Sequence, residues 1–219
     1  MRQLLLDLLP ESPPSLDNFV PGGNLETLAA FTGWLAGERM EFSFCLWGEA
    51  GSGCSHLLKA SGFAYVDAAA NPALAGVPAA EELAVDHVEA LEGEGQIALF
   101  NLFNRLKASG GRLLTAAPQP PAHLALREDL RTRLGWGLIY RLQPLSDAEK
   151  AAAVASQAKE RALKLTPDAI NYLLRHAPRD MRTLSAFAVA LDRYTLEHKR
   201  AVTLPLLREL LQTPLETTP

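Results

Sequence analysis

Cysteine is scarce in this sequence, with only Cys45 and Cys54 among 219 residues. So few cysteines exclude a disulfide-stapled scaffold and favour free thiols in a reducing compartment. The five histidines show none of the spacings that bind zinc, which argues against a metal centre built from histidine and cysteine. The sequence therefore indicates a globular protein with one ordinary core, or with a larger and a smaller domain.

Long apolar runs and blocks of basic residues are also missing. No segment reaches the length that spans a bilayer, and the apolar start, Met1 to Leu9, is too short for a secretory signal. The net charge of −4 argues against strong direct DNA binding. We therefore expect a cytoplasmic protein that has no membrane partner.

The sequence does contain a regular alternation of short apolar segments with helical patterns. Strands are predicted at 42–47, 63–66, 83–86, 113–117 and 138–142, and helices at 24–36 and 96–107. Such alternation favours an α/β fold, with a parallel sheet that has helices on both faces.

The character of the sequence changes after Pro144, where no strand pattern follows. Ser146 is a predicted helix cap, and helical segments are expected at 147–163, from Thr166-Pro167 onward, at 179–198 and at 204–211. We therefore divide the chain into four parts: a tail with a proline-rich linker (1–15), an α/β domain (16–145), a small all-helical domain (146–214) and a short tail (215–219).

The stretch from Gly48 to Ser55 is the most informative motif, because it lies between a predicted strand and a predicted helix. Strand, glycine-rich loop and helix form the context of a phosphate-binding P-loop, whose backbone N–H groups converge on phosphate oxygens. The predicted phosphate-binding residues are Gly48, Gly51, Ser52, Gly53, Cys54, Ser55 and His56. The alternative is a glycine-rich turn that binds nothing.

Cys54 occupies the position at which a P-loop requires lysine. The backbone cradle is thus present without its main cation, which predicts weak nucleotide binding. A cysteine at a helix N-terminus tends to have a lowered thiol pKa, and any thiolate there would repel phosphate, as would oxidation of the thiol.

The segment Leu83 to Asp86 resembles the Walker B strand of ATPases, in which the final carboxylate lies beside the metal. Ser55 and Asp86 are accordingly the predicted ligands of a weakly held Mg²⁺. His87 follows at the position where many ATPases carry a water-activating acid. A neutral histidine could orient a water there, but the catalytic carboxylate is lost and hydrolysis should be slow. Alternatively, Asp86 merely caps the segment that follows.

Together with these motifs, residues 131–137 and 180–184 resemble the AAA+ module of the DnaA replication initiator family over most of residues 16–212. The resemblance implies a bound ADP, or ATP with Mg²⁺. It places Asn18, Phe19 and Val20 near the adenine, and makes Arg182 a sensor that reaches the nucleotide. The alternative for Arg182 is a solvated charge on a helix face.

Arg133 lies where members of that family carry an arginine finger, which reaches the γ-phosphate of a neighbouring subunit. An arginine finger stabilises the charge of the transition state and is worth about 10³–10⁵ in rate. The alternative is a surface ion pair with Glu128 or Asp129.

The N-terminus and residues 140–147 resemble the Hda family, the regulatory homologues of DnaA. That resemblance implies that a peptide containing Gln3, Leu4, Leu6 and Leu8 binds the sliding clamp, the β subunit of DNA polymerase III. Leucines of an extended peptide can fill an apolar pocket while a glutamine fixes its orientation. Asp7 departs from the family pattern, and an ordinary packed segment is the alternative.

The resemblance implies a bacterial regulator that uses Arg133 to stimulate hydrolysis of ATP on DnaA. Such a chain would prevent re-initiation without being a useful ATPase itself. Two alternatives are an autonomous AAA+ ATPase of the helicase-loader type and a DnaA-like DNA-binding scaffold. The missing P-loop lysine argues against the first and the negative net charge against the second. The oligomeric state, including a homodimer, stays open.

Overall fold

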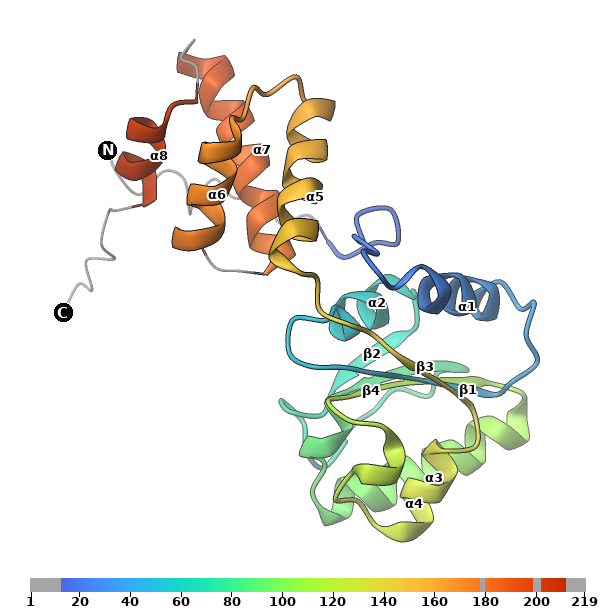
Figure 1. Ribbon diagram of the computed structural model, residues 1–219. Helices are drawn as coiled ribbons and strands as arrows, with labels where there is room; N and C mark the ends of the chain where they lie inside the picture. Colours follow the sequence, from blue (N-terminus) through green and yellow to red (C-terminus); the bar gives the residue numbers. More distant parts are fainter. Residues whose placement is uncertain (1–12, 178–179, 199–201, 212–219) are drawn as a thin grey trace, which may run out of the picture. The chain divides into compact units, whose positions relative to one another are not determined.

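The computed structural model describes residues 13–177, 180–198 and 202–211. The residues from Pro13 to Pro144 form one compact unit, and those from Leu145 onward belong to a second (Figure 1). The two units are described separately below. In the described ranges, no helix is long and apolar enough to cross a membrane.

The first unit is built on a parallel sheet of five strands in the order β2-β3-β4-β1-β5. In chain order the strands are β1 (Ser43–Trp47), β2 (Ala64–Asp67), β3 (Glu82–Asp86), β4 (Arg112–Ala117) and β5 (Leu138–Arg141). All five strands predicted from the sequence are present, with ends that differ by one residue in most cases. β1 lies in the interior of the sheet, which explains why its apolar run is continuous.

Helices cover both faces of the sheet, as predicted (Figure 1). One face packs against α1 (Leu25–Leu35) and α2 (Cys54–Ala60), through a cluster that contains Phe31, Phe44 and Leu57. The other packs against α3 (Gly93–Ser109) and α4 (Glu128–Leu134), through a cluster that contains Leu99 and Leu130. Two 3₁₀ turns, Val88–Ala90 and Pro121–His123, lie in the connections.

Helix α3 begins three residues earlier than the predicted segment 96–107, and its first turn contains Gly93 and Gly95. Glycine disfavours helix, so the pattern alone did not indicate this turn. A Cβ atom on Gly95 would lie 1.9 Å from the carbonyl oxygen of Pro72. The glycine thus allows the helix to pack closely against the loop that follows β2.

The second unit is all-helical, as predicted, with α5 (Asp147–Glu160), α6 (Pro167–His176), α7 (Met181–His198) and α8 (Leu204–Leu211). Ser146 and Glu149 form a capping box at the start of α5, and the Thr166 hydroxyl accepts a hydrogen bond from the Ala169 N–H at the start of α6. Helix α5 ends before the expected residue 163, because Ala162 has a left-handed backbone with φ of 55°. Two apolar clusters fill this unit, around Val154 and Phe187 and around Leu173 and Leu191.

Candidate functional site

The predicted P-loop connects β1 to α2, and its glycines are required by the backbone. A Cβ on Gly48 would lie 2.3 Å from the carbonyl oxygen of Leu142, so only glycine fits there. Gly51 and Gly53 have φ values of 82° and 102°, which other residues rarely adopt. Figure 1 shows this loop at the end of β1 where α2 begins. The loop therefore has the strand, the turn and the helix start that the motif predicted.

Cys54 is the first residue of α2, but its thiol is directed into the protein. Its Sγ atom lies 3.4 Å from the Ser52 hydroxyl oxygen, and the side chain packs against the apolar cluster between the sheet, α1 and α2. Burial raises the pKa of the Cys54 thiol to about 11, in spite of the hydrogen bond with Ser52. The expected lowering of the Cys54 thiol pKa is therefore wrong, because desolvation of the side chain outweighs the effect of the helix N-terminus.

Ser55 and His56 follow on the first turn of α2, and the imidazole of His56 contacts the entry segment. His56 Nε2 donates a hydrogen bond to the Ser15 carbonyl oxygen at 2.8 Å, and its ring centre lies 5.4 Å from that of Phe19. The Ser55 hydroxyl has no hydrogen-bond partner among the described residues, so it is free to bind a ligand.

Asn18, Phe19 and Val20 belong to a tight segment that lies against the loop. The Asn18 side chain accepts a hydrogen bond from the Ser15 N–H and donates one to the Pro13 carbonyl, each at 2.9 Å. The Phe19 ring is so close to Gly53 that a Cβ there would lie 2.8 Å from its Cε2 atom. The predicted entry segment and the predicted P-loop are therefore neighbours in the fold.

Asp86 ends β3 and is buried, with 2% of its surface exposed. Its Oδ2 atom accepts a hydrogen bond from the Tyr65 hydroxyl at 2.8 Å, and its Oδ1 atom accepts one from the His87 backbone N–H at 3.0 Å. Both oxygens therefore already have a donor, although each keeps a second lone pair for another ligand.

His87 is paired with Asp67, a partner that the sequence did not indicate. Its Nδ1 atom donates to Asp67 Oδ1 at 2.9 Å, and its backbone is left-handed, with φ of 52°. Burial acts to lower the pKa of His87, but the hydrogen bond to Asp67 and the nearby carboxylates raise it above the usual value of 6.5. Burial also acts to raise the pKa of Asp67, but the hydrogen bond from His87 holds it below 3.8.

Sequence reasoning missed Tyr65 and Asp67. Parallel pairing of β2 with β3 sets Asp67 opposite Asp86, so both carboxylates lie at the same edge of the sheet. A polar residue at the end of a strand next to β3 was the available signal.

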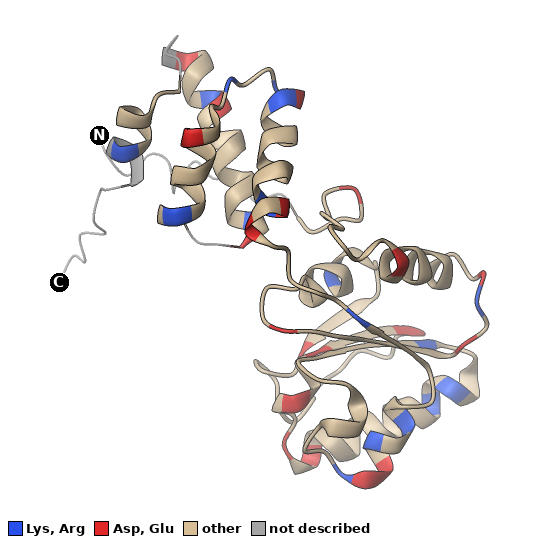
Figure 2. Cartoon of the chain, viewed as in Figure 1, with Lys and Arg blue, Asp and Glu red and all other residues tan. Residues whose placement is uncertain are grey.

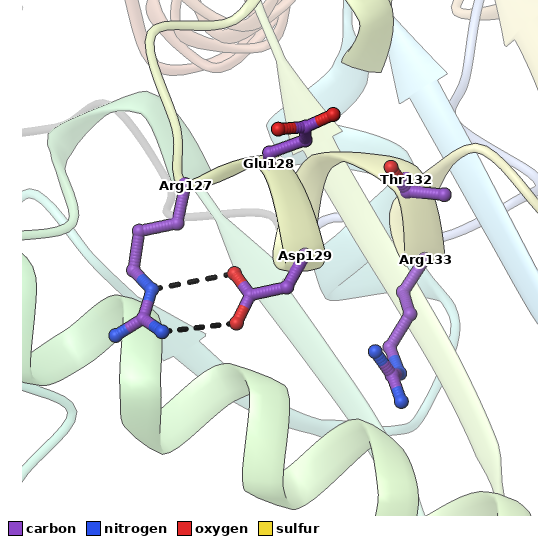
Figure 3. A pocket seen from close by; sticks show the side chains of 5 residues that line it. All are labelled: Arg127, Glu128, Asp129, Thr132 and Arg133. Atoms are coloured by element: carbon purple, nitrogen blue, oxygen red, sulfur yellow. Dashed lines mark hydrogen bonds and ion pairs between the residues drawn. The ribbon is translucent and has the colours of Figure 1, made fainter.

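Arg133 lies on α4 in a separate group, and its guanidinium is held by α3. Its Nε atom donates to Asn104 Oδ1 at 3.0 Å, and its Cζ atom lies 4.1 Å from the centre of the Phe100 ring. Arg127 pairs instead with Asp129 at 2.9 Å. Arg127 and Asp129 point toward each other while Arg133 extends away from Glu128 (Figure 3). Among the described residues, no ion pair joins Arg133 to Glu128 or Asp129.

Arg133 also lines an open pocket on the surface of α4. Its other lining residues come from the same helix and the residue before it: Arg127, Glu128, Asp129 and Thr132 (Figure 3). The two terminal nitrogens of Arg133 have no hydrogen-bond partner within the described part of the chain. The guanidinium is thus oriented through Nε while its other end stays available.

Five predicted residues remain. Arg182 is exposed in the first turn of α7, in the second unit. Gln3, Leu4, Leu6 and Leu8 lie outside the described residues.

The fold matches solved structures of DnaA and RuvB. Domain III of the Thermotoga maritima initiator DnaA aligns with a TM-score of 0.71 and 21% identity, over 93% of this chain and 98% of that chain. DnaA of Aquifex aeolicus bound to AMPPCP gives 0.66 and 23%, over 86% and 69%. The Holliday junction branch migration motor RuvB of Thermotoga maritima gives a TM-score of 0.64 and 15% identity, over 91% of this chain and 72% of that chain. These structures show that the fold is that of an AAA+ module.

Residues 147–211 match the family model of the Hda lid domain. The chain is therefore similar to Hda in its helical unit and to DnaA domain III in its fold. The all-helical unit therefore corresponds to a lid domain of the Hda type.

Proposed function

We propose that this protein inactivates DnaA by stimulating the hydrolysis of DnaA-bound ATP. The observation that supports the proposal best is the state of Arg133. Its Nε atom is bonded to Asn104 and its plane lies on Phe100, whereas its terminal nitrogens have no partner in the described ranges. A guanidinium oriented in this way needs little further ordering to reach the γ-phosphate of a neighbouring subunit.

The P-loop of this protein itself would bind ADP as a structural ligand. The backbone of Gly48 to Ser55 would hold the phosphates, Phe19 and its neighbours would lie near the adenine, and Arg182 of the lid would reach the nucleotide. Ser55 and Asp86 would hold a weakly bound Mg²⁺, which would neutralise phosphate charge. A DnaA structure of similar fold contains the nucleotide AMPPCP, which supports nucleotide binding in general. Cys54 contributes no charge, so affinity should be modest and hydrolysis by this chain slow.

The sliding clamp would concentrate this protein where replication is under way. Residues 3–8 would bind the clamp as an extended peptide, ahead of a proline-rich linker that gives reach. We take residues 1–15 as this tail and linker, 16–145 as the AAA+ domain and 146–214 as the lid. Hydrolysis of DnaA-bound ATP would then follow DNA synthesis and prevent re-initiation.

The test is ATP turnover by DnaA in the presence of DNA-loaded clamp and the full chain. Arg133→Ala should remove the stimulation, which for an arginine finger is about 10³–10⁵-fold at most. Arg127→Ala is the matched control, because Arg127 lines the same pocket but is paired with Asp129. The double variant Gln3→Ala/Leu6→Ala should lose clamp binding with an unchanged circular dichroism spectrum.

Full stimulation by Arg133→Ala would exclude Arg133 as the finger. Brisk ATP turnover by the chain without DnaA would instead favour an autonomous ATPase of the helicase-loader type.

A further inference from the structure

Trp136 is exposed beside Arg133, in the turn between α4 and β5. Fifty-nine per cent of its surface is accessible, although it is among the largest apolar side chains of the protein. The Arg133 guanidinium lies 5.6 Å from its ring centre, and the Lys107 ammonium lies 4.8 Å from it. More than half of the tryptophan surface is thus left outside the core of the fold.

The backbone holds this tryptophan in one place. The Trp136 N–H donates to the Arg133 carbonyl at 3.0 Å, and the Trp136 ring meets the edge of Phe103 with centres 6.3 Å apart. Gly137 follows, where a Cβ would lie 2.1 Å from the Ser43 carbonyl oxygen, so the turn is packed directly onto β1. A rigid aromatic side chain loses little conformational entropy when a partner covers it.

The tryptophan is continuous with one face of α3. Ile97, Phe100 and Lys107 recur at helical spacing on this face, and Ile97 is 46% exposed. We call Ile97, Phe100, Lys107, Arg133 and Trp136 the Trp136 surface. Its positive charge comes from Lys107 and Arg133, which both lie over the Trp136 ring. Other lysine and arginine residues lie on α3 and α4, together with acidic residues in the first turn of α4 (Figure 2).

This composition is typical of the centre of a protein interface. Tryptophan and arginine dominate the residues whose truncation costs binding energy, and partner charges are usually complementary. A chain with a net charge of −4 and no basic block is poorly suited to hold nucleic acid here by charge alone. The surface therefore fits a protein that presents negative charge, such as a triphosphate, toward Arg133.

The geometry points to Trp136 as the anchor by which the ATP-bearing face of the partner AAA+ subunit docks beside Arg133. This inference rests on the proposed function, since it assigns the contact that holds the partner while Arg133 acts. Trp136 would supply affinity, and Arg133 would supply the charge that accelerates hydrolysis.

The experiment measures DnaA-bound ATP hydrolysis with clamp on DNA, as a function of the concentration of the full chain. Trp136→Ala should raise the half-maximal concentration roughly 30-fold and leave the maximal rate within about twofold. Trp136→Phe keeps an aromatic ring and should recover much of the loss. Met40→Ala is the control, because Met40 is 94% exposed in the loop before β1 and should change neither parameter.

A second measurement separates this inference from the proposed function. This measurement compares how tightly Arg133→Ala and the double variant Arg133→Ala/Trp136→Ala bind AMPPCP-loaded DnaA. The double variant should bind more weakly. If the wild-type chain binds DnaA without stimulating hydrolysis, the proposed function is wrong. The docking role of Trp136 is then decided by this binding measurement alone.

Three results would overturn the inference. The first is a half-maximal concentration for Trp136→Ala equal to that of Met40→Ala. The second is a lower maximal rate without any loss of affinity, which would make Trp136 a support for Arg133 only. The third is a Trp136→Ala variant that still binds DnaA but has lost self-association or oligonucleotide binding. Loss of self-association would assign the surface to a second copy of this chain, and loss of oligonucleotide binding would assign it to single-stranded DNA.

Discussion

The Sγ atom of Cys54 lies 3.4 Å from the hydroxyl oxygen of Ser52, across the loop that the sequence predicts to bind phosphate. At this position a P-loop normally has a lysine that reaches the terminal phosphates. Here the side chain is instead turned into the apolar cluster behind the loop. The Cys54 thiol therefore contributes to the packing of the loop. Because it replaces the lysine, the predicted phosphate site has no cation at this position.

Restoring the lysine should therefore strengthen nucleotide binding. We expect Cys54→Lys to bind ADP about tenfold more tightly, because a charged hydrogen-bond donor contributes about 1.5–3 kcal/mol. ATP turnover should stay slow, because His87 still stands in place of the catalytic acid. Titration calorimetry and a turnover assay on the same protein measure both effects.

Cys54→Ala is the control for the lysine variant, since it removes the thiol without adding charge and should change ADP affinity little. An unchanged affinity in Cys54→Lys would mean that the loop does not bind phosphate.

Both cysteines should resist oxidation in the folded protein. Burial raises the pKa of Cys54 to about 11 and that of Cys45 to about 12. At pH 7 only about one Cys54 thiol in 10⁴ is then a thiolate, which is the reactive form. Millimolar peroxide should leave ADP affinity unchanged, and a thiol reagent should label both cysteines rapidly only after denaturation. Rapid labelling of the native protein would contradict neutral thiols that are buried at Cys45 and partly buried at Cys54.

The sequence predicted local features of the fold well and distant contacts poorly. Strands, helix caps and the glycine-rich loop depend on neighbouring residues, so patterns of a few residues were enough. The contact of Phe19 with Gly53 and that of Asn104 with Arg133 join residues about thirty apart. Their geometry depends on how α2 and α3 pack, which no local pattern encodes.

Cys54 illustrates the same limit for chemistry. Its position at a helix start favoured a lowered thiol pKa, and this effect is local. Burial depends on the sheet and α1 as well, and it reverses the direction of the shift. Sequence position therefore indicated the residue of interest but not its protonation state.

Gly53→Ala should destabilise the protein more than the same change at another left-handed glycine. Gly76 has φ of 67° and open space around it, so Gly76→Ala should cost only the backbone strain of about 1–2 kcal/mol. Gly53 has φ of 102°, and a methyl group there would also displace the Phe19 ring. We expect an additional cost of about 1–3 kcal/mol, by analogy with overpacked sites.

Urea unfolding of the two glycine variants, with ADP absent, measures this difference. Equal losses would show that Phe19 moves away from Gly53 without cost and is not held against the loop.

The pair of His87 and Asp67 should make stability depend on pH in a defined window. The pKa of His87 is raised, so its contribution is complete below the unfolded value of about 6.5 and is lost as the pH rises through the folded value. The pKa of Asp67 is lowered, so its contribution is present above the unfolded value of about 3.8 and is lost as the pH falls through the folded value. The pair should therefore stabilise the fold most between about pH 4 and 6.5.

His87→Asn tests this window without adding backbone strain, because asparagine tolerates the left-handed conformation of residue 87. The difference in Tm between wild type and His87→Asn should be largest near pH 5 to 6 and should shrink as the pH rises through the folded pKa of His87. In an Asp67→Asn background the same substitution should lose most of this pH dependence. A Tm difference that is constant from pH 5 to 8.5 would show that His87 and Asp67 do not titrate as a pair.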